Sequence, residues 1–133
     1  MNASTSIRPG FSLVEVLAAV AIIGIVTFLA IPNIIQVKQD SEDNLARAKA
    51  NTLNLAIASY VQAAGPAAAS SNWSGKTDAY RYTNCLTPYI AFPEANFTAF
   101  TPGGYSFTLP ATIFPLTSKT LITNTNTSNS VDY

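Results

Sequence analysis

The chain carries the stretch GFSLVEVL at residues 10–17, which places one carboxylate, Glu15, at the start of a long apolar run. From Val16 to Val37 there is no ionisable side chain. About 20 apolar residues suffice to cross the hydrocarbon core of a bilayer, which is ~30 Å thick. A carboxylate in such a layer is costly unless a cation pairs with it, so Glu15 is a candidate functional residue.

This stretch resembles the cleavage site of type IV prepilins and of the pseudopilins of type II secretion systems. The resemblance covers roughly residues 1–37 and rests on Gly10, on Phe11 directly after it, on Glu15, and on a hydrophobic helix that contains Pro32. In that family, a membrane peptidase cuts between the glycine and the phenylalanine and methylates the new amino terminus. The resemblance implies that residues 1–10 are a leader, which fold reasoning leaves out, and that Phe11 becomes N-methylated.

The implied cleavage gives Glu15 a cation to pair with. Cutting after Gly10 creates an ammonium group on Phe11, and methylation keeps its charge. In a filament of staggered helices, Glu15 of a neighbouring chain can supply the anion and so fix the axial register. A pair within one chain is an alternative, because residues four apart share a helix face. The other interpretation of the stretch is an ordinary signal anchor with a tolerated glutamate near the interface.

Residues 11–64 are predicted to form one long helix whose first part, 11–37, lies in a membrane or in the core of a filament. This part contains Gly24 and Pro32. Proline removes a backbone hydrogen bond and crowds the preceding turn, so a kink or local melting is expected near Thr27–Pro32. Two interpretations stay open: a helix that must bend as the subunit leaves the bilayer, or a static kink.

The second part of the helix, 38–64, carries charges and an apolar stripe. The stripe residues recur at helical spacing, which predicts one buried face: Leu53, Ile57, Tyr60, Val61 and Ala64. Gly65 and Pro66 are expected to end the helix, with glycine at the cap and proline just beyond it.

Residues 65–133 are expected to form a small β-rich head with a loose, Asn/Thr/Ser-rich tail at 124–133. Residues 67–75, around Trp73, are predicted to be a loop. Strand formers and turn residues then predict several short strands: 80–83, 86–92, a hairpin of 97–101 with 105–109, an interrupted segment at 112–116, and an edge strand at 121–123. In the hairpin, Tyr105 and Phe107 alternate with polar residues, so one face is expected to be buried.

The predicted fold class is α+β: a long N-terminal helix packed through its second half on a small antiparallel sheet of three or four strands. A few short strands are unstable without a partner face, and the apolar stripe supplies one. The resemblance implies the same arrangement, the lollipop shape of a pilin.

Composition offers no catalytic, metal or cofactor site. The 133 residues contain no histidine, and Lys+Arg and Asp+Glu number 7 each, so there is no basic excess of the kind that nucleic-acid binding needs. Cys85 is the only cysteine, which leaves a buried thiol or an intermolecular bridge as interpretations. The acidic residues beyond 64 are too widely spaced for a calcium site: Asp78, Glu94 and Asp132. The chain is not expected to be an enzyme.

The resemblance therefore predicts a structural subunit of a type IV pilus-like filament. Its implied partners are itself and other pilins or pseudopilins, the prepilin peptidase and methyltransferase, the assembly platform of the inner membrane, and membrane lipid before assembly. Its implied location is the inner membrane, then a surface pilus or a periplasmic pseudopilus. The alternatives are a pseudopilin of type II secretion and a membrane-anchored binding module that never polymerises.

Overall fold

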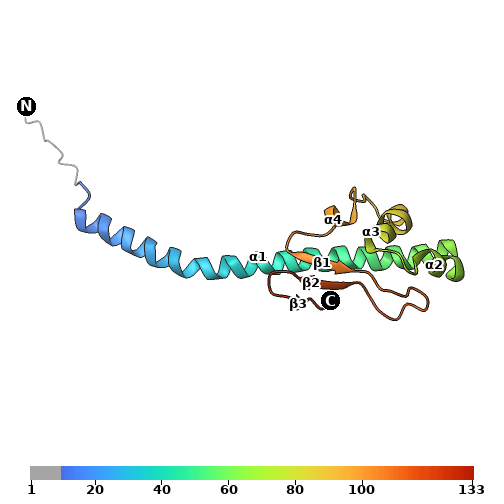
Figure 1. Cartoon of the computed structure of the whole chain (residues 1–133). Helices are drawn as coiled ribbons and strands as arrows, with labels where there is room; N and C mark the ends of the chain where they lie inside the picture. Colours follow the sequence, from blue (N-terminus) through green and yellow to red (C-terminus); the bar gives the residue numbers. More distant parts are fainter. Residues whose placement is uncertain (1–9) are drawn as a thin grey trace, which may run out of the picture. The chain divides into compact units, whose positions relative to one another are not determined.

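The computed structural model describes residues 10–133, and its first element is the helix α1, Leu13–Ala64 (Figure 1). The long predicted helix is thus confirmed, except that Phe11 and Ser12 precede its first turn. The chain divides into two compact units, Met1–Gln39 and Asp40–Tyr133, and α1 contributes to both. All of the predicted leader except Gly10 lies outside the described residues.

In the first unit, the backbone is helical from Leu13 onward, through Gly24 and Pro32. Pro32 has no amide hydrogen to donate to the carbonyl of Phe28, so one bond of the helical ladder is absent there. One turn earlier, the Thr27 hydroxyl donates to the carbonyl of Ile23 at 2.7 Å, a contact that often bends helices. The predicted kink or local melting at this place stays a prediction.

The second unit, called the head below, begins with the last part of α1. This part buries a face with helical periodicity: Ala46, Ala50, Leu53, Ala56, Ile57 and Tyr60. The predicted stripe is confirmed at its centre, whereas Val61 is only half-buried and Ala64 is exposed. The buried alanines at the start of the face have short side chains, which let other backbone segments approach the helix closely.

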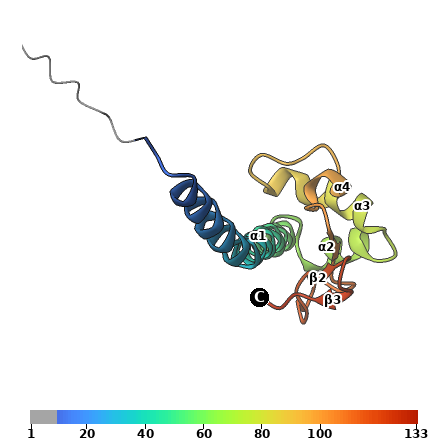
Figure 2. The same cartoon turned by 90° about the vertical axis from the view of Figure 1, so that its left-hand side faces the viewer.

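The region between α1 and the sheet is helical, and this corrects the prediction of a loop and two strands at 67–92. It contains five short elements: α2 (Pro66–Trp73), α3 (Asp78–Tyr80), the π-helix η1 (Arg81–Leu86), the 3₁₀-helix η2 (Thr87–Tyr89) and α4 (Phe97–Phe100). Figures 1 and 2 show α3 and α4 on one side of the head and the sheet on the other.

Local capping explains why these segments are helical. Gly65 has a φ of 82°, which a glycine adopts without strain, and Pro66 then starts α2 at a position that suits its fixed φ. The side chains of Thr77 and Asn96 accept hydrogen bonds from the amides of Tyr80 and Ala99. Each of these side chains satisfies an amide that the first turn of a helix leaves without a partner.

The sheet has three antiparallel strands, within the predicted range: β1 (Tyr105–Thr108), β2 (Leu121–Asn124) and β3 (Asn129–Ser130). Tyr105 pairs with Asn124, and Thr123 pairs with Ser130.

The predicted hairpin of 97–101 with 105–109 is wrong, because its first half forms α4 and β1 pairs with β2 instead. The segment 121–123 belongs to the central strand and not to an edge. The predicted alternation along 105–109 is confirmed, since Tyr105 and Phe107 are buried and Ser106 and Thr108 are exposed.

The predicted loose tail is also corrected, because it contains β3 and its end packs against the core. Both Val131 and Tyr133 contact the core from partly buried positions. The Tyr133 hydroxyl lies between α1 and the sheet, where it accepts from the Asn54 amide at 2.9 Å and donates to the carbonyl of Thr120. A few polar residues at the end of the chain therefore help to attach the sheet to α1.

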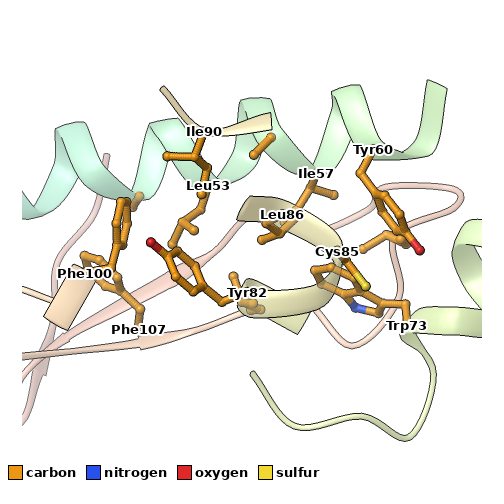
Figure 3. Close-up of a cluster of buried hydrophobic side chains, with 14 of the residues drawn as sticks. Leu53, Ile57, Tyr60, Trp73, Tyr82, Cys85, Leu86, Ile90, Phe100 and Phe107 are labelled. Atoms are coloured by element: carbon orange, nitrogen blue, oxygen red, sulfur yellow. The ribbon is translucent and has the colours of Figure 1, made fainter. Parts of the chain in front are cut away.

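The core of the head lies between α1, the short helices and the sheet (Figure 3). Leu53 and Ile57 of α1 are fully buried. In this view Ile57 lies close to Leu86 of η1, and Phe107 of β1 lies next to Phe100. Tyr82 packs between the rings of Phe97 and Phe100, with centroids 5.7 and 5.3 Å away. Full burial of each large apolar side chain stabilises the fold by about 1.5–3 kcal/mol. The α+β fold class is thus confirmed.

Candidate assembly site

Gly10 and Phe11 lie in non-helical backbone directly before α1. The Phe11 side chain is 86% exposed. A Cβ atom added at Gly10 would meet no other atom within 4 Å, so packing within the chain does not require a glycine at this position. The bond between these two residues is therefore exposed on both sides, as access by a peptidase would require.

Glu15 lies in the first turn of α1, and its side chain is exposed. The carbonyl of Ser12 accepts hydrogen bonds from the amides of Glu15 and Val16, at 3.0 and 3.2 Å, and so starts the helical ladder. The positive end of the helix dipole favours a carboxylate in this turn. Sequence reasoning missed this local role, although serine followed three residues later by glutamate is a known signal of a helix start.

No side-chain cation of the first unit can reach Glu15 among the residues that the structure describes. Within residues 10–133, the nearest one in the sequence is Lys38, which lies ~34 Å further along the helix at about 1.5 Å per residue. In the uncut chain, Phe11 precedes the helix. It therefore does not share a helix face with Glu15, as a pair within one chain would require. The pairing of Glu15 with the amine of Phe11 stays a prediction.

Between Phe11 and Val37, the large apolar side chains of α1 are all exposed. Mean hydropathy reaches 2.7 over 18 residues of this helix, and none of that window is buried. Of the described helices, α1 alone is long and apolar enough to cross a membrane. An apolar surface of this extent marks a contact with lipid or with other protein. Gly24 lies on it with nothing within 4 Å of an added Cβ atom.

The head contributes no cluster of metal ligands among residues 10–133, where no three His, Cys, Asp or Glu side chains come together. Cys85 lies on η1 and is 3% exposed, in agreement with the interpretation as a buried thiol. Its neighbours include Tyr60, whose pKa is raised first by burial and then by a hydrogen bond with Cys85.

Tyr105 connects the start of the sheet to α1 by donating its hydroxyl to the Asp43 carboxylate. Burial, followed by this hydrogen bond and the charge of Asp43, raises the pKa of Tyr105 to about 12 from a usual value of 10.0. A raised pKa means that folding favours the neutral phenol. The resulting stabilisation is complete below pH 10 and is lost as the pH rises to about 12.

We expect Tyr105→Phe to remove part of this alkaline loss of stability. Denaturant midpoints of the full chain in detergent micelles, measured between pH 8 and pH 12, should fall less steeply for the variant than for the unchanged chain. Some slope should remain, because burial also raises the pKa of Tyr82 and Tyr133. Equal slopes for both proteins would show that the Tyr105–Asp43 contact does not respond to pH.

Comparison with known families finds a match at the N-terminus. The family described as the prokaryotic N-terminal methylation motif matches residues 7–31, which include Gly10, Phe11 and Glu15. No curated protein and no solved structure matches the chain. The motif, together with the exposed apolar helix that follows it, indicates a precursor anchored in a membrane through its N-terminus. This match agrees with the resemblance of the N-terminal stretch to type IV prepilins and pseudopilins.

Proposed function

We propose that this chain is a structural subunit of a type IV pilus-like filament. It is cut between Gly10 and Phe11, methylated at Phe11, and assembled through α1. The observation that carries the proposal is the uncovered apolar surface of α1 with one carboxylate in its first turn, inside a matched methylation motif. Membrane lipid covers this surface before assembly, and the α1 helices of neighbouring copies cover it afterwards.

In the assembled filament, Glu15 of one copy pairs with the methylated amine of Phe11 in the next. The apolar surroundings leave no water to solvate either charge, so helices that are out of register leave one charge unpaired. Gly24 and Pro32 allow α1 to bend as it leaves the bilayer. The peptidase, the methyltransferase and the assembly platform of the inner membrane act on the chain before it joins the filament.

A second candidate is a pseudopilin, which forms a short periplasmic filament in type II secretion. The small three-stranded sheet and the single buried cysteine favour it, since many pilins close a C-terminal loop with a disulfide. Both candidates share the processing and the helix-driven assembly. They differ in whether the filament reaches the cell surface.

Mass spectrometry of the N-terminal peptide from two cell fractions distinguishes these functions. We expect a peptide that begins with N-methyl-Phe11 in sheared surface material. The same peptide confined to membranes would point to a pseudopilin or a minor subunit. An intact leader in every fraction, in cells that process other prepilins, would exclude both and leave a membrane-anchored module.

A further inference from the structure

Phe92 stands at the tip of the loop 90–96 between η2 and α4, and its side chain is 98% exposed. Both flanks of this loop are fixed. On one side, Ile90 is buried in the core, and on the other, the carbonyl of Glu94 accepts a hydrogen bond from the Tyr82 hydroxyl at 3.2 Å. The ring is therefore held in solvent by a loop that is attached to the head at both ends.

The backbone of Phe92 is strained. Its φ is 56°, a conformation that is unfavourable for a bulky residue and that glycine adopts freely. The next residue is Pro93, and a residue before proline prefers an extended conformation with negative φ. Strained residues of this kind persist where the surrounding structure fixes them, and they gather at binding sites.

The head also contains a pocket of about 150 Å³ between the end of α2 and the segment 111–114. Trp73 and Ile113 line it and are themselves buried, and the exposed ring of Phe114 lines it as well. Hydroxyl residues complete the lining, so the pocket is of mixed polarity: Ser70, Ser74 and Thr112. Its volume is similar to that of a cavity that holds a benzene ring. No described residue of the same chain fills this pocket.

The pocket and the Phe92 loop belong to different parts of the head. Figures 1 and 2 show the loop before α4 on the side of the short helices, and the connection between β1 and β2, which contains 111–114, on the side of the sheet. A projecting group on one side and a matching pocket on the other produce a head-to-tail contact that repeats from copy to copy.

We propose that the Phe92 ring of one copy inserts into the pocket between α2 and 111–114 of a second copy of this chain. The contact rests on the proposed filament function and adds a specific bond between heads to the packing of the α1 helices. Residues of opposite charge stand close to the two surfaces in the sequence. Glu94 follows Phe92 by two residues, and Lys76, whose Nζ lies 5.1 Å from the ring centroid of Tyr80, follows the pocket residue Ser74 by two.

Disulfide trapping in intact cells tests the contact. The chain carries Cys85→Ala together with Ala91→Cys and Thr112→Cys, both at exposed positions, so the ring of Phe92 stays in place. Mild oxidation should produce a ladder of dimers, trimers and longer species. Co-expression of the two single-cysteine chains should produce dimers only. The control pair Ala91→Cys with Ser106→Cys places the second thiol at an exposed position of β1 outside the pocket, and it should stay monomeric.

Each outcome separates this contact from the filament function. Filaments without a ladder would overturn the contact alone, and dimers of Ala91→Cys by itself would overturn its head-to-tail geometry. A ladder in membranes of cells that form no filaments would support the contact and overturn the filament. Cells with neither filaments nor a ladder would overturn both.

A second measurement uses the loss of the ring. Phe92→Ser should lower filament yield about ten-fold or more, since burial of a phenylalanine changes an association constant by about that factor. The matched control is Leu121→Ser, which removes a half-exposed apolar side chain from β2 and should leave the yield unchanged. Equal yields from both variants would show that the ring of Phe92 carries no assembly contact.

Discussion

Glu15→Val should leave the protein inserted in the membrane and the head folded, but lower the yield of filaments about 100-fold or more. The substitution removes the carboxylate from the first turn of α1 and leaves the apolar surface intact. In the proposed filament, the methylated amine of Phe11 would then have no anion. An unpaired charge in an apolar environment costs about 3–5 kcal/mol. Each ~1.4 kcal/mol of this cost lowers the association constant ten-fold.

The measurement is the amount of sheared filament relative to membrane-bound subunit, with and without the unchanged chain in the same cell. Co-expression should partly restore incorporation, because neighbours then supply some of the carboxylates. The control is Asp40→Val, which removes an exposed carboxylate from the same helix beyond the apolar run and should assemble normally. If Glu15→Val filaments were as abundant and as regular as those of the unchanged chain, Glu15 would have no role in register.

The N-terminal part of this chain could be predicted from sequence because its signals are local. An apolar run of this length has few folds available, and the positions of Gly10, Phe11 and Glu15 are read directly from the motif. The exposed apolar helix and the placement of Glu15 in its first turn follow from the same residues. The proposed partner of this carboxylate, the methylated amine of Phe11 in a neighbouring copy, could not be observed in a single uncut chain.

Prediction failed in the head, where tertiary contacts override local preference. The segment from Tyr80 to Tyr89 is rich in strand-forming residues, yet it forms helical turns that place Tyr82 and Leu86 against α1. Strand preference largely reflects how side chains pack on a sheet, so it predicts little for a segment that packs against a helix. The strained φ of Phe92 and the pocket between α2 and 111–114 depend on the whole head, and no local pattern indicates them.

Trp73 illustrates the same limit most clearly, because the sequence predicts a loop around it, whereas it ends α2 and is buried in the core of the head. The side chain is 1% exposed, and its Nε1 donates to the carbonyl of Pro110 at 2.8 Å. The ring lies 6.3 Å from that of Tyr60, centroid to centroid, and the Arg81 guanidinium lies 5.0 Å from it. Arg81 also donates to the backbone carbonyl of Trp73 and pairs with Asp78. Trp73 thus connects α1, α2, η1 and the end of β1.

Trp73→Ala should destabilise the head by about 3–5 kcal/mol, as expected when a buried tryptophan leaves a cavity. The buried Cys85 thiol measures this loss in the full chain in detergent micelles, because a maleimide reaches it only when the head opens. The rate of modification should rise about 100-fold or more, since each ~1.4 kcal/mol increases the open population ten-fold.

The matched variant Trp73→Phe separates packing from hydrogen bonding. It keeps an aromatic ring in the core but removes the donor to Pro110, which leaves a buried carbonyl without its partner at a cost of about 1–3 kcal/mol. The rate at which its Cys85 thiol is modified should therefore lie between the rates of the unchanged chain and of Trp73→Ala.

Exposed Leu55 on α1 provides the surface control, because Leu55→Ala removes no buried contact and should leave the rate unchanged. If Cys85 stayed protected in Trp73→Ala, α1 and η1 would remain packed without the tryptophan. The stability of the core would then depend on Leu53, Ile57 and Leu86 instead.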